Sequence, residues 1–397
     1  MSMFSTALIL RTRNIARLSA LQLPSRNAQL FRQYATKITE PKKKSSTLKL
    51  LLIGGAIGGT IGTVYSAYDN IGKKKATTKD LTPTILKEKP DVPVMRKIIN
   101  PNDKTGLDII LFQFQTCPFC CKVRAFLDYS GLSYSVVEVD AVLRQSIKWS
   151  QSKKVPIVLV RSKDGDYVQL NDSSMIISAI SSILVDPVKN DIKDVQKYYP
   201  VQKFEDVYGT LFDIANKYFL MFQDKKPKIS KELFDEERKY RSWTDNHLVH
   251  LISPNVYRTY GEARETFEWF SDVGQWNVYF PEWERNLMVH VGTFAMWLIS
   301  KRLKKKHGLT DDVRIHLYDA CDKWMGALEK KQTTFLGGKE PNLADLSVFG
   351  VLCSMEGCEA FQDCLDNTKL GKWFYDVKAK VESNRGYRVP VSFYELQ

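Results

Sequence analysis

The sequence predicts an α/β domain followed by an all-helical domain, with a membrane anchor ahead of both. Three observations lead to this prediction. Residues 50–68 carry no charged side chain. Residues 105–185 alternate short apolar runs, typical of buried strands, with helical patterns, whereas helical patterns dominate residues 201–397. At 397 residues the chain also exceeds what one hydrophobic core usually supports.

The net charge of +13 is concentrated near the N-terminus. Residues 1–79 hold 14 of the 58 Lys and Arg residues but only two of the 45 acidic residues. The remainder of the chain therefore carries 44 basic and 43 acidic residues and is almost neutral. Bulk charge gives no support for a basic groove that binds nucleic acid, and we expect no nucleic-acid partner.

The composition of residues 1–49 predicts either a basic targeting segment or a disordered tail. The first 39 residues contain five arginines, several serines and no acidic residue, the composition of an organelle-targeting segment. This composition favours a mitochondrial location as one alternative. Either interpretation leaves the segment outside the folded part of the protein.

Residues 50–68 are long enough to cross a bilayer core as one helix, which predicts a single-pass membrane anchor. Lysines flank both ends, so the positive-inside rule leaves its orientation open. Gly54, Gly58 and Gly62 recur every fourth residue and make a face on which a second helix could pack. A homodimer through this face and a glycine-rich span without a partner are both compatible with the pattern.

The seven cysteines are odd in number, and three of them crowd into one short motif. This usage suits a reducing compartment better than a disulfide framework. We therefore expect the folded part to lie on a reducing side of the membrane.

The α/β domain is expected over residues 105–185, after a linker over residues 69–104 that is rich in proline and mixed charges. The expected elements are a strand at 108–114, a helix from Pro118 to the stop at Gly131, a strand at 133–139, a weaker helix at 141–150, a hairpin of 156–160 with 167–170, and a helix from Ser173 to about Leu184. This β-α-β-α-β-β-α order is that of the thioredoxin fold.

Cys117 and Cys120 form a C-P-F-C motif at the start of the first expected helix. Free backbone N–H groups and the positive end of the helix dipole favour a thiolate at Cys117, and Pro118 suits the first helical position. Lys122 and Arg124 add positive charge nearby, so we expect a depressed pKa at Cys117. Cys120 is the candidate resolving thiol, and without a second Cys or His pair at suitable spacing no zinc site is expected.

Two further segments fit the same kind of site. Val155-Pro156 stands where thioredoxin-like folds place a cis proline, so that the Val155 backbone would pair with an extended peptide. Asp172 and Ser173 open a helix, where Ser173 could hold a carboxylate and Asp172 an ammonium group. The γ-glutamyl end of glutathione offers both groups. A mere turn at Pro156 and a simple helix cap at Asp172 are the plainer alternatives.

After a charged linker at 186–200, residues 201–397 are expected to form an all-helical domain. Asn342 and Asp345 have the spacing of a capping box at the start of one of its helices. The apolar run at 288–299 is too short to span a membrane and reads as core. His247 and His250 could share a ligand, although histidines within a core are the simpler interpretation. The expected helices are 203–222, 235–251, 279–305, 311–329 and 342–355.

Six stretches resemble the membrane-associated prostaglandin E synthases of the second type, a glutathione-transferase-like family. They are TCPFCCKVRAFLDY at 116–129, KKVPIVLV at 153–160, LNDSSMIISA at 170–179, LVHLISPNVYRT at 248–259, LISKRLKKKHGL at 298–309 and PNLADLSVFGVL at 341–352. The resemblance covers nearly the whole folded part and implies a helical domain like that of glutathione transferases, as well as a Golgi membrane location.

The resemblance implies isomerisation of prostaglandin H endoperoxide to prostaglandin E in a cleft between the two domains. Cys117 would supply the thiol that acts on the peroxide bond. Glutathione would lie along Val155, Pro156, Asp172 and Ser173, and the family is also associated with haem bound together with glutathione. Where the family has a tyrosine three residues before the first cysteine, this chain has Phe114, which cannot donate a hydrogen bond to the sulfur.

Two other functions remain compatible with the sequence. The first is a glutaredoxin-like thiol oxidoreductase or glutathione transferase that uses Cys117 and Cys120. The second is a membrane-tethered module that binds glutathione or haem without turnover. Loss of Cys120 separates isomerase from oxidoreductase, because dithiol exchange needs both thiols and isomerisation needs one.

Overall fold

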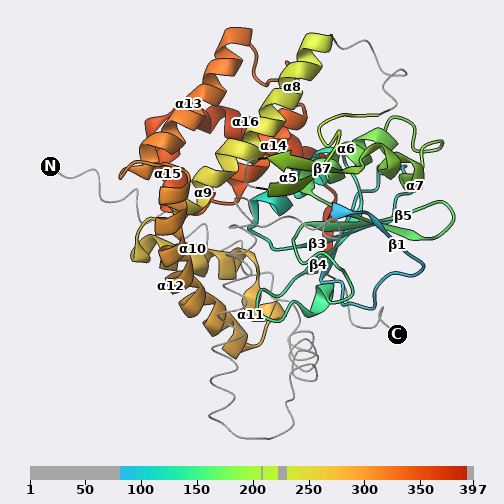
Figure 1. The fold of residues 1–397 in the computed structure, drawn as a ribbon, viewed down its shortest axis with the longest axis horizontal. Coiled ribbons are helices and arrows are strands. Elements are labelled where there is room, and N and C mark those ends of the chain that lie inside the picture. The colour runs from blue at the N-terminus through green and yellow to red at the C-terminus, as the bar shows by residue number, and fades with distance from the viewer. Residues whose placement is uncertain (1–80, 207–208, 222–229, 391–397) are drawn as a thin grey trace, which may run out of the picture.

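The computed structural model describes residues 81–206, 209–221 and 230–390 (Figure 1). The predicted N-terminal segment at 1–49 and the predicted anchor at 50–68, with its glycine face, lie outside these residues. Among the described helices, none has both the length and the apolar character that a bilayer crossing requires.

A seven-stranded mixed sheet forms the centre of the α/β part, in the order β1-β6-β5-β3-β4-β2-β9. Its middle follows the predicted thioredoxin order, because β3 runs parallel to β4 and antiparallel to β5, and β5 pairs antiparallel with β6. The strands are β1 (Thr84–Leu86), β2 (Arg96–Ile99), β3 (Ile109–Gln113), β4 (Tyr134–Glu138), β5 (Ile157–Arg161), β6 (Tyr167–Asn171) and β9 (Tyr387–Pro390).

Two helices, both predicted from the sequence, cover one face of this sheet. Helix α5 (Pro118–Tyr129) begins at its proline and ends just before Gly131, whose φ of +67° suits a residue without a side chain. Helix α6 (Ser173–Ile183) is buried along its whole length. These local signals in the sequence were therefore sufficient to predict both helices.

The expected linker at 69–104 contributes two strands instead. β1 adds to the edge beside β6, and β2 adds beside β4. Pro83, Pro90 and Pro93 lie outside these strands, so they do not interrupt the ladders. The C-terminal end also returns to the sheet, because β9 pairs antiparallel with β2.

The weaker helix expected at 141–150 is wrong, because the segment forms only a short 3-10 turn at Gln145–Ile147. Asp140 holds this loop by accepting the backbone N–H groups of Leu143, Arg144 and Gln145. Arg144 has a left-handed backbone with φ of 50°, which is incompatible with a continuous helix.

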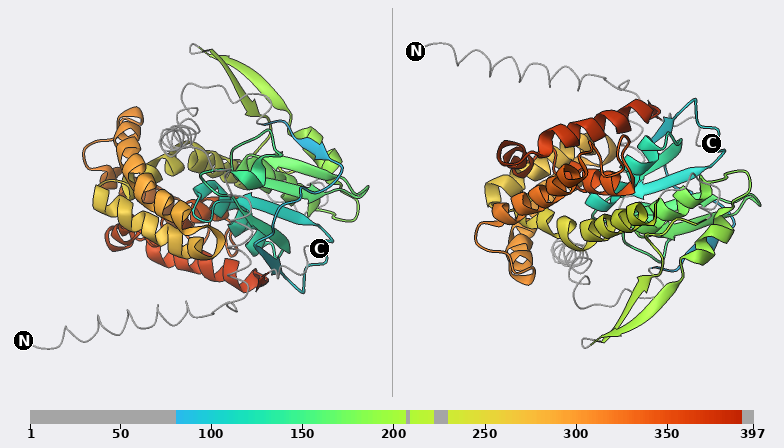
Figure 2. Two further views of the ribbon diagram at one scale, coloured as in Figure 1. Left: turned by 90° about the horizontal axis from the view of Figure 1, so that it is seen from below. Right: turned by 90° about the horizontal axis from the view of Figure 1, so that it is seen from above.

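The helix expected at 203–222 is also wrong. Residues Val201–Asp206 and Gly209–Ile214 form the hairpin β7–β8, a separate two-stranded sheet that extends away from the body of the molecule (Figure 2). Valine, phenylalanine, threonine and isoleucine are frequent in this stretch, and such β-branched and aromatic residues favour extended backbone. Apolar residues at helical spacing were therefore a misleading signal here.

The rest of the C-terminal part is helical up to β9. The predicted capping box is confirmed, since Asn342 and Asp345 bond to each other's backbone at the start of α14. The apolar run at 288–299 lies within α12. The helices are α7 (Ile192–Val195), α8 (Lys231–Trp243), α9 (Val249–Val256), α10 (Tyr260–Val273), α11 (Trp276–Tyr279), α12 (Glu282–Lys306), α13 (Val313–Lys331), α14 (Leu343–Cys353), α15 (Glu359–Asn367) and α16 (Leu370–Asn384).

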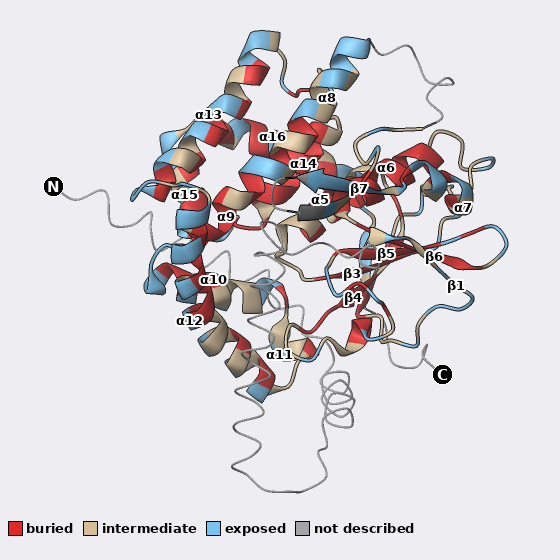
Figure 3. Cartoon of the chain, in the orientation of Figure 1, coloured by how far each residue is buried: buried red, intermediate tan, exposed pale blue. Residues whose placement is uncertain are grey.

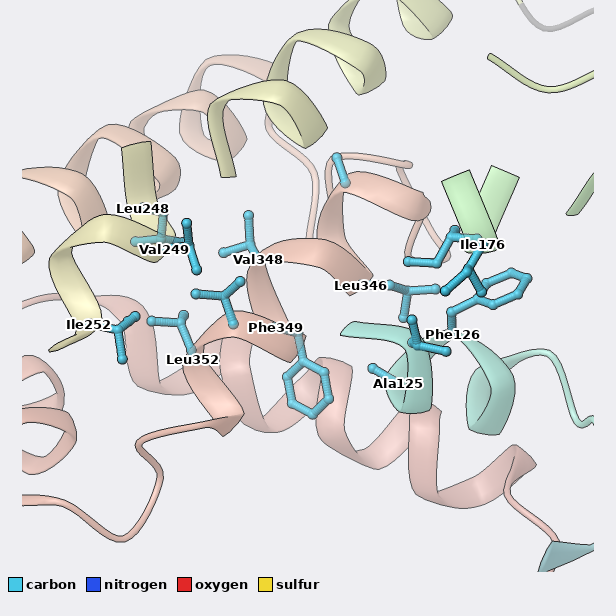
Figure 4. Close-up of a cluster of buried hydrophobic side chains, with 14 of the residues drawn as sticks. Ala125, Phe126, Ile176, Leu248, Val249, Ile252, Leu346, Val348, Phe349 and Leu352 are labelled. Atoms are coloured by element: carbon cyan, nitrogen blue, oxygen red, sulfur yellow. The ribbon is translucent and has the colours of Figure 1, made fainter. Parts of the chain in front are cut away.

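Helix α14 joins the two parts of the molecule through one continuous hydrophobic core. Its Leu346 packs toward Phe126 of α5 and Ile176 of α6, while Leu352 faces Ile252 of α9 (Figure 4). The elements at this junction are buried, whereas the outer faces of α8, α12 and α13 are exposed (Figure 3). The α/β and helical parts therefore form a single packed unit.

Close approach of α14 to α5 depends on Gly350. A side-chain carbon at Gly350 would lie 2.5 Å from the Lys122 Cα atom, well inside van der Waals contact. Only glycine allows the two helices to cross at this separation. The contact fixes the first turns of α5, which follow Cys117, against the helical part.

Candidate active site

Cys117 is the N-cap residue of α5, and Pro118 occupies the first helical position. The Cys117 backbone is extended, with φ of −69° and ψ of 126°, and its side chain makes no capping hydrogen bond. The sulfur is therefore placed beside the free N–H groups of the first helical turn. Cys117 is half-buried, whereas Cys120 and Cys121 are buried.

The predicted depression of the Cys117 pKa is confirmed, and its main cause is Cys120. The Cys120 thiol donates a hydrogen bond to the Cys117 sulfur, and this outweighs the opposing effect of burial. The backbone N–H groups of Cys120 and Phe119 and the charge of Arg124 lower the pKa further. Cys117 is thus the more acidic thiol of the pair.

Cys120 has the opposite character. Burial raises the pKa of Cys120 well above its ordinary value, and the bond to Cys117 and the negative charge there raise it further. Cys120 therefore keeps its proton and serves as a donor to Cys117. Burial also raises the pKa of Cys121, whose thiol donates to the Gln115 carbonyl, as expected for a packing residue.

Arg124 is held in place by polar groups at the ends of β3 and β4. Its guanidinium donates to the Gln113 side chain over 2.6 Å and to the Gln115 carbonyl over 2.8 Å. Gln113 in turn donates to Glu138, which forms a buried ion pair with Arg96 of β2. Strand β2, which the sequence did not predict, thus helps to fix a cation near Cys117.

The sheet register brings the predicted site segments to one edge. Phe112 at the end of β3 pairs with Ile157 at the start of β5, and Ile157 pairs with Asn171 at the end of β6. The loop to Cys117, the Val155-Pro156 segment and the turn into α6 therefore leave the sheet side by side. The Val155–Pro156 peptide bond is cis, as the sequence position indicated.

Asp172 and Ser173 open α6 at this edge. Asp172 is the N-cap residue, and its side chain accepts hydrogen bonds from the backbone N–H groups of Ser174 and Met175 at 2.9 and 3.1 Å. Its φ of 72° is unusual for a residue other than glycine, and such conformations cluster at functional sites. Its other carboxylate oxygen lies 3.9 Å from the Lys217 ammonium.

Lys122 does not act on Cys117 as the sequence suggested. Its side chain is fully buried, and its ammonium group donates to the hydroxyls of Ser173 and Ser174 and to the Asp245 carboxylate. Because Asp245 neutralises this charge locally, Arg124 is the cation that lowers the Cys117 pKa. The correction follows from the fold, since Asp245 is 123 residues away along the chain.

Sequence reasoning missed three groups that surround the start of α6. Asp245 comes from a π-helical turn (Thr244–Leu248) between α8 and α9, and it also accepts hydrogen bonds from Ser174 and Tyr218. Lys217 and Tyr218 follow the hairpin β7–β8. No local motif marks these residues, since they meet α6 only through tertiary packing.

Phe114 lies three residues before Cys117, in the loop after β3. Its carbonyl accepts the Cys117 backbone N–H at 3.2 Å, and its half-buried ring packs against the smaller hydrophobic cluster that includes Phe112. The ring offers no donor to the sulfur, so the lowered pKa of Cys117 depends on Cys120, the helix end and Arg124.

The two histidines considered as ligands each lie against another ring. His250 stacks on His307 with ring centroids 4.7 Å apart, and His247 lies beside Trp243. Within the part of the chain that the structure describes, no group of three or more His, Cys, Asp or Glu side chains is arranged to hold a metal ion.

A thioredoxin-type sheet, a thiol pair at a helix start and an adjoining cis proline define the class: a thioredoxin-fold thiol protein with a helical C-terminal domain. The Glutaredoxin family model matches residues 109–164, which include the thiol pair. The crystal structure of the β-etherase LigF from Sphingobium sp. strain SYK-6 aligns with 70% of this chain and 98% of its own, at 16% identity and a TM-score of 0.38.

Two curated relatives are far more similar in sequence. Prostaglandin E synthase 2 of Danio rerio is 46% identical over 274 residues, which are 68% of this chain and 70% of the relative. Prostaglandin E synthase 2 of Mus musculus is 45% identical over 282 residues, covering 70% of this chain and 71% of the relative. The chain belongs to the prostaglandin E synthase 2 family.

Proposed function

We propose that this protein is a thiol-dependent isomerase that converts prostaglandin H endoperoxide to prostaglandin E. The observation that carries the proposal is membership of a family whose relatives bear the name prostaglandin E synthase 2, combined with a thiol at Cys117 whose pKa is lowered. A thiolate is the nucleophile that a weak peroxide bond requires.

The reaction needs only one thiol. The Cys117 sulfur attacks one peroxide oxygen, the O–O bond breaks, and the other oxygen leaves as an alkoxide that takes up a proton. Loss of the ring proton from the carbon bearing the sulfur-bound oxygen then forms the ketone and breaks the S–O bond, which returns the thiolate. The Cys120 thiol, already hydrogen-bonded to Cys117, stabilises the thiolate before attack and after release.

We propose that glutathione binds along Val155, Pro156, Asp172 and Ser173. The fit rests on polar groups suited to its γ-glutamyl end, since Asp172 supplies a partly exposed carboxylate for the ammonium and Ser173 begins a helix for the carboxylate. Bound glutathione would supply a thiol in addition to those of Cys117 and Cys120. Nothing in the described geometry favours haem over glutathione alone, so the proposal includes no step that uses haem.

A glutaredoxin-like oxidoreductase is the second candidate, and the specific observation in its favour is Cys120. A thiol in hydrogen-bond contact with Cys117 lies where a resolving cysteine is needed, and the Glutaredoxin model matches this region. Under this proposal Cys120→Ser abolishes dithiol exchange, whereas an isomerase keeps its activity.

The decisive experiment supplies prostaglandin H endoperoxide to the full chain in detergent, with and without glutathione, and quantifies prostaglandin E. Cys117→Ser should abolish product formation. Cys353→Ser, at a half-buried cysteine in α14 outside the motif, is the matched control and should retain it. Equal product from wild type and Cys117→Ser would refute the isomerase proposal.

We also propose the membrane arrangement suggested by the sequence: a segment at 1–49, a single-pass anchor at 50–68, and a folded part on a reducing side of a Golgi or mitochondrial membrane. The acid-free N-terminus supports the mitochondrion, and family resemblance supports the Golgi. Alkaline extraction of membranes from cells expressing the chain with and without residues 50–68 tests the anchor. Release of both forms would count against it.

Homodimerisation through the glycine face of the anchor completes the proposal, together with two domains centred on 105–185 and 201–397, where β1, β2 and β9 extend the sheet of the first domain from outside its range. Gly54, Gly58 and Gly62 support the dimer by their spacing. Cross-linking of the full chain in membranes should give a dimer that Gly58→Leu reduces. Limited proteolysis should cut first within the charged segment at 186–200, if that segment separates the two domains.

A further inference from the structure

Lys122 is an unusual residue for the interior of the molecule. Its side chain is fully buried, and all three protons of its ammonium group are used, by Ser173 at 3.2 Å, by Ser174 at 3.0 Å and by Asp245. Buried ion pairs usually add little net stability, because desolvation offsets their attraction. A contribution to binding is therefore a reason to retain such a pair.

Two of the partners of Lys122 lie at the start of α6, where the γ-glutamyl carboxylate of glutathione is proposed to bind. Ser173 is the first residue of α6, and among the described hydrogen bonds its backbone N–H has no partner. The Ser173 hydroxyl oxygen accepts a hydrogen bond from Lys122, so the hydroxyl proton is left to point elsewhere. A carboxylate at the helix start is the acceptor that this proton fits.

Asp245 fixes the position of Lys122. Burial alone would raise the pKa of Asp245, but the Lys122 charge and hydrogen bonds from Lys122 and Ser174 lower it, so the carboxylate stays ionised. Tyr218 adds a hydrogen bond of 3.1 Å. Asp245 belongs to the π-helical turn of the helical part, whereas Lys122 belongs to α5. The ion pair therefore connects the two parts of the molecule beside the start of α6.

We propose that Lys122 and Asp245 are positioning residues for glutathione. Asp245 holds Lys122, and Lys122 orients the Ser173 hydroxyl as a donor to the γ-glutamyl carboxylate. This inference rests on the proposed glutathione site. It gives the helical domain a direct role in recognising a ligand that otherwise contacts the thioredoxin-type domain.

The test compares two ligands on the full chain in detergent. One is glutathione, and the other is 4-aminobutyryl-cysteinylglycine, which keeps the ammonium and the thiol but lacks the γ-glutamyl carboxylate. Isothermal titration should show that wild type prefers glutathione by about tenfold or more, the value of a charge-assisted hydrogen bond. In Lys122→Met and in Ser173→Ala the preference should fall by about tenfold, and the double variant should lose no more than either single variant.

Two further variants separate positioning from a purely structural role. Lys122→Met combined with Asp245→Asn leaves no unpaired buried charge, so it keeps the test valid if Lys122→Met alone is poorly folded. Glu262→Gln weakens the buried pair with Arg314 inside the helical part and serves as the matched control. It should lower stability while keeping the preference for glutathione.

Several results would overturn the inference: an unchanged preference in Lys122→Met, additive losses with Ser173→Ala, equal loss in Glu262→Gln, or a wild type that binds both ligands equally or not at all. The proposed isomerase activity fails in a different way. A wild type that discriminates between the ligands but makes no prostaglandin E would refute the isomerase and leave the positioning pair standing.

Discussion

Glu284 provides a sharp test of how burial controls stability in this protein. It lies in the first turn of α12, is 3% exposed, and its Oε1 atom has no hydrogen-bond partner among the residues that the structure describes. Burial, assisted by the charge of Asp140, raises the pKa of Glu284 to about 8 from an ordinary value of 4.5. The folded state therefore holds this proton at a pH where the unfolded chain releases it.

The sign and size of the contribution of Glu284 to the free energy of unfolding follow from the linkage between proton binding and folding. Stability from this group is fully present below pH 4.5 and is lost as the pH rises toward 8. At about 1.4 kcal/mol per pKa unit, the loss of stability up to pH 8 is at most about 5 kcal/mol. Relaxation of the helix start would reduce this loss to about 2–3 kcal/mol. Glu284→Gln removes the titration, so the variant should exceed wild-type stability at pH 8 and lose that advantage at pH 5.

The assay is urea unfolding of the full chain in detergent at pH 5, 6, 7 and 8. The wild-type free energy of unfolding should fall across this range, and that of Glu284→Gln should fall by about 2–3 kcal/mol less. Glu282→Gln, at an exposed position in the same helical turn, is the matched control and should leave the wild-type pH dependence unchanged. Parallel curves for wild type and Glu284→Gln would refute the reasoning.

Three other substitutions probe the site and the junction of the two parts. Gly350→Ala places a carbon against the Lys122 backbone and should cost about 1–3 kcal/mol by urea unfolding; no loss would mean that the two helices separate freely. Phe114→Tyr adds a donor three residues before Cys117 and should move the pH profile of iodoacetamide alkylation to lower pH; an unchanged profile contradicts this. Cys120→Ala removes the main donor to Cys117 and should move the same profile to higher pH, whereas a shift to lower pH would rule out that donor role.

Much of the site could be predicted because its signals are local. Pro118 marks a helix start, Pro156 immediately precedes a strand, and Asp172 caps the next helix, so a few residues of sequence predict each feature. The sheet register then brings them to one edge. The thioredoxin-type order supplies that register once the strands are recognised.

The remaining features depend on contacts between distant segments. The buried partner of Lys122 is Asp245, in a π-helical turn that no composition signal marks. Strand β2 lies in a proline-rich segment that was predicted to be a linker. Its partner β9 comes from the C-terminal end of the described chain. The prediction for the segment that forms the hairpin β7–β8 was wrong for a different reason. Its apolar residues recur at helical spacing, whereas its β-branched and aromatic residues favour strands.

The proposed isomerisation and dithiol exchange compete for one intermediate, and Cys120 decides between them. While Cys117 is a thiolate, its charge helps to hold the pKa of Cys120 high. Once the Cys117 sulfur is bonded to a peroxide oxygen that charge is gone, and Cys120 becomes a better nucleophile. Attack by Cys120 on the Cys117 sulfur would release a diol and leave a disulfide, a two-electron reduction of the substrate by the two thiols.

This competition yields a final prediction about the products. In single turnover without glutathione, wild type should form some diol together with an equal amount of the Cys117–Cys120 disulfide. Cys120→Ala should form ketone alone, more slowly at neutral pH because its Cys117 is less ionised. Mass spectrometry of the product and of the alkylated protein measures both quantities. Diol from Cys120→Ala in the absence of any added thiol would show that Cys120 is not the reductant.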